Sequence, residues 1–192
     1  CARGCFVLKK HAMELIMGCL LLLCFYCLSR EAAAVSARMS QKKVIVVDCG
    51  HGGIDPGMIG IDGLKEKEFN LAIGMKLKKA LEDYGYQVVM TRETDTGLYD
   101  EDSQNKKAQD MQKRILLIQK VDPVLTVSIH QNSYEDPAVK GPQVFYYRDS
   151  SKGKALAEIL QDRFDYVLGD QNRRLPKANA NYYLLLHVKC PI

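Results

Sequence analysis

The sequence predicts an α/β domain with a mostly parallel sheet and helices on both of its faces. Three observations lead to this fold class. The stretch Lys43–Asp48 contains a continuous β-branched run, which is typical of a strand buried on both faces. Segments with helical spacing then alternate with further strand-like runs, and this order favours parallel pairing. The 192 residues also suffice for one ordinary domain with its own core.

The remaining elements follow in order along the chain. A glycine-rich loop from Gly50 to Gly63 follows the first strand, and residues 66–84 have the apolar spacing of a helix that Gly85 ends. The later predictions are a strand over 86–91, a helix with Ala108, Met111, Ile115 and Ile118 on one face, strands over 124–129 and 143–147, a helix over 150–168 with Ala155, Leu156, Ile159, Leu160, Phe164 and Val167 inward, and a strand over 182–188.

The first 37 residues differ in character from the rest. Lys9 and Lys10 precede an uncharged apolar stretch, Leu15–Leu28, which is shorter than the roughly 20 residues of a bilayer span. A basic start followed by such a stretch fits a cleaved signal peptide or a retained signal anchor, with cleavage candidates in Ala32–Ala34 and Val35–Ala37. We therefore expect residues 1–37 to be a leader with a linker and residues 38–192 to be the catalytic domain.

Charge and cysteine content narrow the classes of function. The formal net charge is only +4 and both signs are interspersed, so the sequence has no basic stripe for nucleic acid. Most of the 7 cysteines lie in the leader, which leaves Cys49 and Cys190 and no disulfide framework. We interpret Cys49 as a small buried residue at a strand end rather than as a ligand or nucleophile.

Two histidines and one glutamate carry the functional prediction. His51 lies between glycines where the first strand ends, Glu66 opens the first helix, and His130 closes the strand over 124–129. Ligands bind outside the carboxyl ends of parallel strands, so these side chains can meet there. Two imidazoles and a carboxylate make a three-ligand zinc site with an open position, at which water becomes a nucleophile near neutral pH. The sequence therefore predicts a metal-dependent hydrolase.

Each residue also has a purely structural interpretation. Taken singly, His51 could be a loop histidine, Glu66 a favourable charge at a helix start, and His130 a structural hydrogen-bonding residue. His187, on the predicted last strand, is interpreted as structural. The combination of the three residues, rather than any one of them, favours a metal site.

Four ordered motifs run through the chain from about Lys43 onward: Val47–Gly53, Gly63–Leu71, Val89–Arg92 and Ser128–Ser133. They resemble the zinc-dependent N-acetylmuramoyl-L-alanine amidase family. The resemblance implies a phosphorylase/hydrolase-like fold, a Zn²⁺ cofactor on His51, Glu66 and His130, and cleavage of the amide between N-acetylmuramic acid and L-alanine in peptidoglycan. It also implies that Glu68 is acidic without being a ligand and that Arg114 is the family's arginine.

Within the family, the apolar leader, residues 101–105, residues 109–114 and Gln131 resemble the germination-specific branch, which acts on spore-cortex peptidoglycan. The resemblance implies peptidoglycan as the partner and a place at the outer face of the cell membrane or in the cell wall or spore cortex. It implies contact with the membrane through the N-terminal apolar segment. An activating protein is a further candidate partner, and nucleic acid is not.

One departure from the family concerns its catalytic glutamate. The family carries this residue in a pattern like Pro-x-x-Leu-x-Glu-x-Gly-Phe, and Pro191 stands at the place of the proline, next to Ile192. The resemblance therefore implies that the general base lies beyond Ile192 and that the catalytic domain is incomplete at its C-terminus. Residues 172–181 also match only loosely. We expect weak zinc binding or weak activity, because loss of a positioned acid or base costs about 10²–10⁴-fold.

Two alternatives to the amidase stay open. One is a non-catalytic peptidoglycan-binding or regulatory module, and the other is a zinc peptidase that acts on stem peptides. The products distinguish them, because an amidase frees the N-terminus of L-alanine, whereas a peptidase creates a new N-terminus inside the stem.

Overall fold

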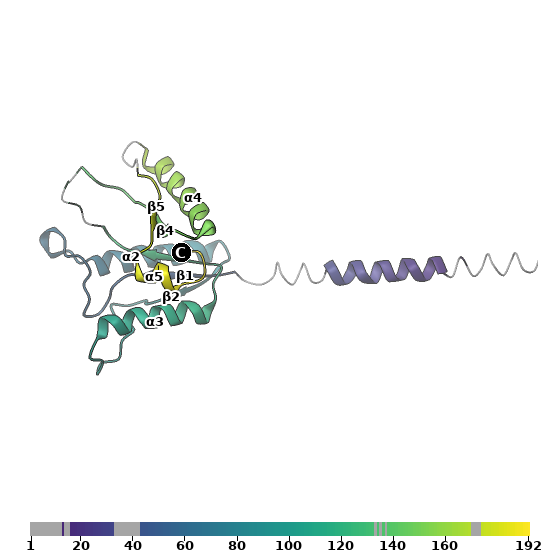
Figure 1. Cartoon of the computed structure of the whole chain (residues 1–192), viewed down its shortest axis with the longest axis horizontal. Coiled ribbons are helices and arrows are strands. Elements are labelled where there is room, and N and C mark those ends of the chain that lie inside the picture. Colours follow the sequence, from purple (N-terminus) through teal and green to yellow (C-terminus); the bar gives the residue numbers. More distant parts are fainter. Residues whose placement is uncertain are drawn as a thin grey trace, which may run out of the picture. The chain divides into compact units, whose positions relative to one another are not determined.

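The computed structural model describes residues 13, 16–32, 43–132, 134, 136, 138–169 and 174–192. The chain divides into two compact units, residues 1–42 and 43–192. In the first unit, residues 16–32 form a helix over most of the apolar stretch of the leader (Figure 1). Among the described residues, no helix combines the length and the apolar character that a membrane crossing requires. Lys9, Lys10 and the cleavage candidates after Ala32 lie outside the described residues, so the leader stays a prediction.

Three parallel strands form the central sheet of the second unit (Figure 1). The strands are β1 (Val44–Cys49), β2 (Gln87–Met90) and β3 (Leu125–Ile129), and β1 lies between the other two. All three were predicted from the sequence. The register pairs Cys49 with Ile129, so β1 and β3 end level with one another and deliver the residues that follow them to the same edge.

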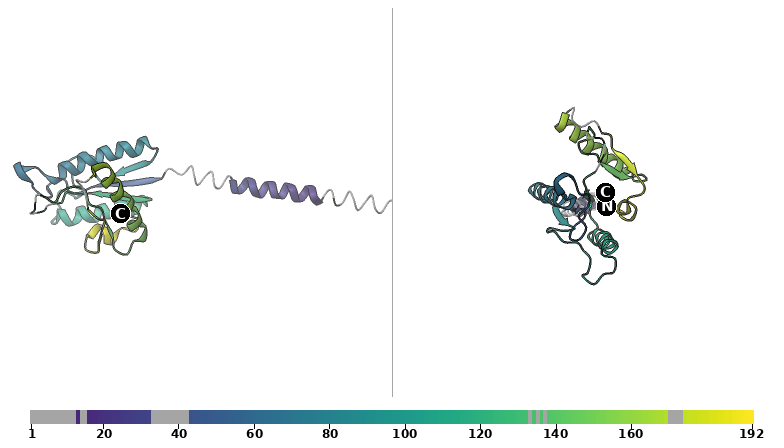
Figure 2. Two further views of the ribbon diagram at one scale, coloured as in Figure 1. Left: turned by 90° about the horizontal axis from the view of Figure 1, so that it is seen from above. Right: turned by 90° about the vertical axis from the view of Figure 1, so that its left-hand side faces the viewer.

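Two helices cover opposite faces of this sheet, α2 (Glu66–Asp83) and α3 (Lys106–Val121) (Figure 2). Val47 of β1 packs with the α2 side, where Leu71, Leu77 and Leu81 join its cluster. Its neighbour Val46 points the other way and packs with Ile115 and Ile118 of α3. Because β1 is paired on both edges and covered on both faces, its sequence is apolar without alternation. The predicted placement of helices on both faces is confirmed.

Side-chain caps set the boundaries of two helices. The Asn105 side chain accepts a hydrogen bond from the Ala108 amide (3.1 Å) where α3 begins, and Asp122, with φ of 49°, ends that helix. The Ser150 hydroxyl accepts a hydrogen bond from the Gly153 amide (3.0 Å) at the start of α4 (Ser151–Leu168). The predicted helix over 150–168 is therefore confirmed, with its first residue acting as the cap.

The C-terminal part differs from the prediction. β4 (Phe145–Tyr147) pairs in parallel with β5 (Lys177–Asn179), which was not predicted, and within the described residues these two form a sheet of their own. The strand predicted over 182–188 is wrong, since α5 (Tyr183–His187) occupies this segment. A further short helix, η1 (Ile61–Gly63), lies in the loop before α2. The apolar run suits either structure, and as a helix it brings Leu184 and Val188 onto the α3 side of the core. His187 lies exposed, with Nδ1 2.8 Å from the Tyr183 carbonyl.

The inward face of α4 is also not the predicted one. Its buried residues are Gly153, Ala157 and Gln161, whereas Ile159 and Val167 are exposed. The Gln161 amide explains the difference, because it accepts a hydrogen bond from the Val144 amide (3.0 Å) and donates one to the Pro142 carbonyl (3.3 Å). This polar side chain satisfies the backbone beside β4, and the two small residues let the helix approach closely.

Gly74 packs α2 against β1, and this contact gives a test of the core. A Cβ atom at Gly74 would lie 2.2 Å from Sγ of Cys49. Gly→Ala in a helix normally stabilises by about 1 kcal/mol, whereas overpacking costs about 1–3 kcal/mol. We expect Gly74→Ala to lower the free energy of unfolding in urea denaturation, because the steric cost outweighs the gain in helix propensity.

Lys76→Ala, at an exposed position of the same helix, is the matched control and should change stability by no more than about 0.5 kcal/mol. Adding Cys49→Ala to Gly74→Ala should recover part of the loss, since it removes the sulfur that the new methyl group meets. A Gly74→Ala chain as stable as the original would contradict this packing.

Candidate metal centre

His51, Glu66 and His130 meet at the carboxyl edge of the central sheet. One ligand atom from each lies within 4.8 Å of the others. Oε1 of Glu66 is 3.3 Å from Nε2 of His51 and 3.0 Å from Nδ1 of His130, and the two rings meet edge to face with centroids 4.9 Å apart. The structure thus brings together the three residues that the sequence predicted as one site.

The turn after β1 sets the position of His51. His51 has a φ of 64°, and Gly52 and Gly53 follow with φ of 137° and 56°. A non-glycine residue in this region is strained and persists only where its surroundings hold it. Gly50 has a different role, because a Cβ atom there would lie 2.2 Å from Cε1 of His130. The glycine therefore lets the second histidine lie directly against the end of β1.

Two buried arginines hold this turn through its carbonyl groups. Arg92 donates from Nε to the Cys49 carbonyl (2.9 Å) and from Nη2 to the Gly50 carbonyl (3.1 Å). Arg114 donates from Nη1 to the Cys49 carbonyl (2.9 Å) and from Nη2 to the His51 carbonyl (2.8 Å). From the sequence, Arg114 was identified only through the family resemblance, which assigned it no role. In the structure it shapes the backbone that presents His51.

Asp48 neutralises Arg114 beneath the turn. Its Oδ1 accepts from Nη1 of Arg114 (2.6 Å) and from the Thr91 hydroxyl (2.9 Å), and its Oδ2 accepts from the Ser128 hydroxyl (2.6 Å). Burial raises the pKa of Asp48, but the charge of Arg114 and the Ser128 hydrogen bond outweigh it, so that the pKa lies below its ordinary value. The buried pair therefore stays ionised, and both carboxylate oxygens of Asp48 accept hydrogen bonds.

Glu66 is held as an anion by a set of donors. Its Oε2 accepts from the Met58 amide (2.9 Å), and its Oε1 accepts from the Gln131 amide (2.9 Å) and the Asn70 side chain (3.2 Å). Burial raises the pKa of Glu66, yet the hydrogen bonds from His130 and these groups outweigh it and hold the pKa well below its ordinary value. A buried, oriented carboxylate of this kind is suited to binding a cation.

Asp55 orients His51, and the sequence reasoning missed it. Oδ2 of Asp55 lies 2.8 Å from Nδ1 of His51. When Nδ1–H donates to this carboxylate, the lone pair of Nε2 faces Glu66, as in many histidines that bind metals. The signal was present in the sequence as the acidic residue of Asp55-Pro56-Gly57 in the loop, four residues after His51.

The residues present fit a zinc ion. Two imidazole nitrogens and one anionic carboxylate oxygen are the donor set of many three-ligand zinc sites, and the Asp55 contact supplies the orienting partner that such histidines usually have. Cys49 does not join them. It is fully buried, and burial raises the pKa of its thiol to about 11, which confirms its interpretation as a small buried residue.

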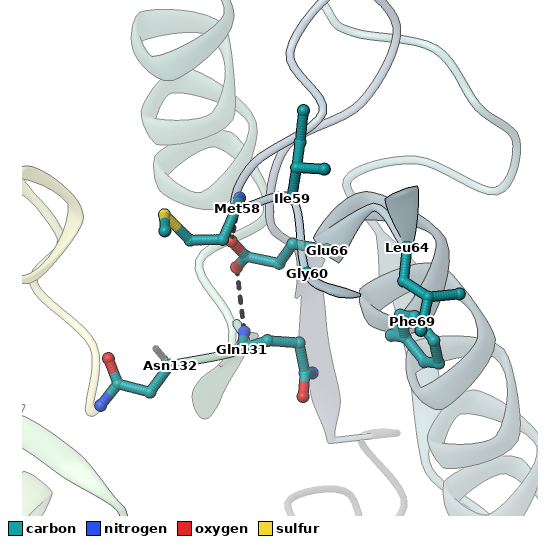
Figure 3. A pocket seen from close by; sticks show the side chains of 8 residues that line it. All are labelled: Met58, Ile59, Gly60, Leu64, Glu66, Phe69, Gln131 and Asn132. Carbon is teal, nitrogen blue, oxygen red and sulfur yellow. Dashed lines mark hydrogen bonds between the residues drawn. The ribbon is translucent and has the colours of Figure 1, made fainter. Parts of the chain in front are cut away.

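A pocket of about 290 Å³ adjoins the cluster (Figure 3). Glu66 lies in its wall, and its Oε2 and Oε1 accept from the backbone amides of Met58 and Gln131 on either side. The other residues that line it are Met58, Ile59, Gly60, Leu64, Phe69, Gln131 and Asn132. A group bound in this pocket would therefore lie beside the candidate metal ligands.

Residues 45–192 match the family described as N-acetylmuramoyl-L-alanine amidase. The chain is 33% identical over 152 residues to the germination-specific N-acetylmuramoyl-L-alanine amidase of Bacillus subtilis, covering 78% of this chain and 63% of that protein. It is 35% identical over 124 residues to the amidase AmiA of Escherichia coli, covering 64% of this chain and 38% of that protein. The chain thus spans less than two thirds of the length of these relatives.

Two solved structures resemble the chain closely. The CwlD amidase from Clostridioides difficile, solved in complex with the GerS lipoprotein, has a TM-score of 0.74 and 36% sequence identity, covering 78% of each chain. The amidase AmiC2 of Nostoc punctiforme has a TM-score of 0.65 and 34% identity, covering 79% of this chain and 77% of that one. These likenesses confirm the α/β fold class predicted from the sequence.

The Ser128–Asp48 hydrogen bond gives a pH-dependent test of the buried network. The folded-state pKa of Asp48 lies below its unfolded value of about 3.9, so its bonds stabilise the fold above that pH and lose their effect as the pH falls through the folded-state pKa. We expect Ser128→Ala to cost about 1.5–3 kcal/mol at pH 7 in metal-free urea denaturation, and less at acidic pH where Asp48 is protonated.

Ser151→Ala, at an exposed position, is the control and should have a small effect at every pH. A cost of Ser128→Ala well below about 1 kcal/mol at pH 7 would contradict a hydrogen bond from Ser128 to an ionised Asp48.

Proposed function

This chain belongs to the N-acetylmuramoyl-L-alanine amidase family, and we propose that it hydrolyses the amide between N-acetylmuramic acid and L-alanine in peptidoglycan. The observation that carries this proposal is the cluster of His51, Glu66 and His130 at the carboxyl edge of the sheet. Their donor chemistry and the anionic state of Glu66 support a bound cation, for which zinc is the natural choice.

Each residue has a distinct task in this proposal. Nε2 of His51, Oε1 of Glu66 and Nδ1 of His130 would hold the ion, while Asp55 keeps the proton of His51 on Nδ1. When bound, Zn²⁺ would polarise the scissile carbonyl and bring the pKa of a water molecule toward neutrality. The two arginines keep the turn rigid, so that the His51 ring keeps one orientation.

The place of action follows from the substrate. Peptidoglycan lies outside the cytoplasmic membrane, so we assign the chain to the outer face of that membrane, the cell wall or the spore cortex. The likeness to the germination-specific amidase supports a role in the cortex of spores. We assign residues 1–37 to export or anchoring and residues 38–192 to catalysis.

A protein partner also belongs to the proposal. The CwlD amidase that this chain resembles was solved in complex with the GerS lipoprotein. We infer that this chain, too, acts together with a partner protein outside the membrane.

Digestion of muropeptides by the zinc-loaded 192-residue chain tests the proposal. At saturating zinc we expect about one zinc ion per chain and slow release of stem peptides with a free L-alanine N-terminus, in line with the weak zinc binding or weak activity that the sequence predicts. Glu66→Gln should lower both zinc affinity and the rate of hydrolysis by more than about 100-fold. Loss of a residue that only hydrogen-bonds a metal ligand costs roughly 10–100-fold, and Glu66 is a candidate ligand itself. Glu68→Gln, exposed one half-turn further along α2, is the matched control and should change neither.

New N-termini inside the stem peptide would indicate a zinc peptidase instead. Stoichiometric zinc without any cleavage would indicate a peptidoglycan-binding module.

Asp55→Asn tests the orientation of His51 separately from the ligands. The variant keeps a hydrogen-bonding side chain but loses the carboxylate charge facing Nδ1, so we expect zinc affinity, measured by competition with a chelator, to fall about 10–100-fold. Asp62→Asn is the control, because Asp62 is exposed on the same loop and asparagine tolerates its φ of 60°. An unchanged affinity in Asp55→Asn would show that His51 needs no such partner.

A further inference from the structure

The loop between β2 and α3, residues 91–105, lies directly against the turn after β1. A Cβ atom at Gly52 would clash with the Thr96 carbonyl oxygen, and one at Gly53 would clash with the Tyr99 hydroxyl oxygen. Glycine at both positions therefore lets the loop approach the turn closely. This approach places polar side chains of the loop beside the backbone of the turn.

Asp95 and Lys67 close a ring of hydrogen bonds around Gly53. Oδ1 of Asp95 accepts from the Gly53 amide (3.0 Å), and Oδ2 of Asp95 accepts from Nζ of Lys67 (2.6 Å). Nζ of Lys67 also donates to the Gly53 carbonyl (2.8 Å). One ion pair thus holds both backbone polar groups of Gly53, which lies two residues after His51. We call this pair, Asp95 and Lys67, the clamp.

Lys67 ties the clamp to the start of α2. It follows Glu66 directly, is buried, and its carbonyl accepts from Nη2 of Arg92 (2.7 Å). The same Nη2 donates to the Gly50 carbonyl (3.1 Å), just before His51. The clamp therefore joins the segment that carries one candidate metal ligand, Glu66, to the segment that carries another, His51.

The turn passes its position on to the His51 ring. Gly52 and Asp55 exchange two backbone hydrogen bonds (3.0 and 3.1 Å), so Gly53 and Ile54 form the tip of a tight turn. Asp55, at the base of this turn, lies with Oδ2 2.8 Å from Nδ1 of His51. Holding the tip therefore fixes the carboxylate that orients the ring.

Further contacts fix the loop that carries Asp95. The Tyr99 hydroxyl accepts from the Ile54 amide (2.9 Å), and the Leu98 amide donates to Oδ1 of Asp110 in α3 (2.6 Å). The loop is thus bonded to a helix on one side and to the tip of the turn on the other. It can hold the turn because it is itself held.

A purely structural role is the alternative. The buried charge of Lys67 needs an anion beside it, and Asp95 is that anion. The Asp95 side chain is 54% exposed, however, so solvent screens the pair and its contribution to overall stability is small. Its hydrogen bonds instead converge on one residue of the turn, which is the arrangement that positioning requires.

We propose that Asp95 and Lys67 are positioning residues of the metal centre, which hold Gly53 so that His51 presents Nε2 toward the ion. They act through the backbone of the turn, and neither side chain belongs to the ligand cluster. The inference rests on the proposed function, since it names residues that keep the geometry of that site.

Amide hydrogen exchange in the metal-free chain and zinc affinity together test the clamp without requiring turnover. We expect Asp95→Ala to raise the exchange rate of the Gly53 amide about tenfold or more, because the charged acceptor is lost. Zinc affinity, measured by competition with a chelator, should fall about tenfold. Exchange of the β1 amides should change far less, since only the turn opens.

Glu93→Ala is the matched control. The Glu93 side chain is also 54% exposed and also pairs with a lysine of α2, Lys78 (2.7 Å), but that pair makes no described contact with the turn. Both readouts should therefore stay unchanged in Glu93→Ala. An unchanged Gly53 exchange rate in Asp95→Ala would overturn the proposal.

The double variant Lys67→Met with Asp95→Ala separates positioning from stability. Methionine keeps an apolar stem but removes the buried charge that Asp95→Ala leaves unpaired, so the free energy of unfolding in urea should return toward its original value. Zinc affinity should stay about tenfold lower, because Gly53 is still not held. Recovery of zinc affinity together with stability would show a structural role and overturn the proposal.

The clamp and the proposed function can fail separately. Lowered zinc affinity in the clamp variants of a chain that cleaves no muropeptide would support the clamp and refute the amidase. Release of L-alanine termini by a chain whose zinc affinity and Gly53 exchange ignore Asp95→Ala would support the amidase and refute the clamp.

Discussion

The buried ion pair of Arg114 and Asp48 is the interaction on which the site depends. β1 ends in a turn with three successive residues at positive φ, and the carbonyl groups at and before that turn accept hydrogen bonds from two buried arginines. Arg114 satisfies two of them and Arg92 a further one. Burying the charge of Arg114 is costly without an anion beside it, and Asp48, the last side chain of β1 but one, is that anion. β1 therefore carries, in Asp48, the counter-ion of Arg114, and Arg114 in turn holds the backbone where β1 ends.

The positions of the candidate metal ligands depend on this turn and on the pairing of β1 with β3. The register of β1 and β3 brings the residues after Cys49 and Ile129 to one edge, and Asn70 of α2 donates to both the Gly50 carbonyl and Glu66. Three elements distant in sequence thus share hydrogen bonds at one point. These hydrogen bonds fix the segments after β1 and β3 against the start of α2, which is what a preorganised site requires.

The sequence predicted the features that depend on local pattern. The central strands, three helices and the meeting of His51 with His130 follow from apolar runs and from parallel pairing. Features that depend on contacts between residues far apart in the sequence were not predicted. The short apolar run at Leu184–Leu186 suits a strand or a helix, and only its contact with α3 decides. Gln161 turns inward because its side chain accepts a hydrogen bond from the Val144 amide beside β4. Asp55 matters because its carboxylate meets the His51 ring, and the spacing of the residues in the sequence does not predict where that ring lies.

The burial of Cys49 has a consequence for redox chemistry. Its sulfur lies two residues from a candidate metal ligand, yet with a pKa of about 11 the thiol stays protonated at physiological pH. Thiolates, not thiols, bind soft metals and react with oxidants. The centre thus offers imidazole and carboxylate donors but no thiolate, despite the nearby sulfur. Copper(I) and similar thiophilic ions find no thiolate there, and an oxidising environment has no accessible sulfur to attack at the end of β1.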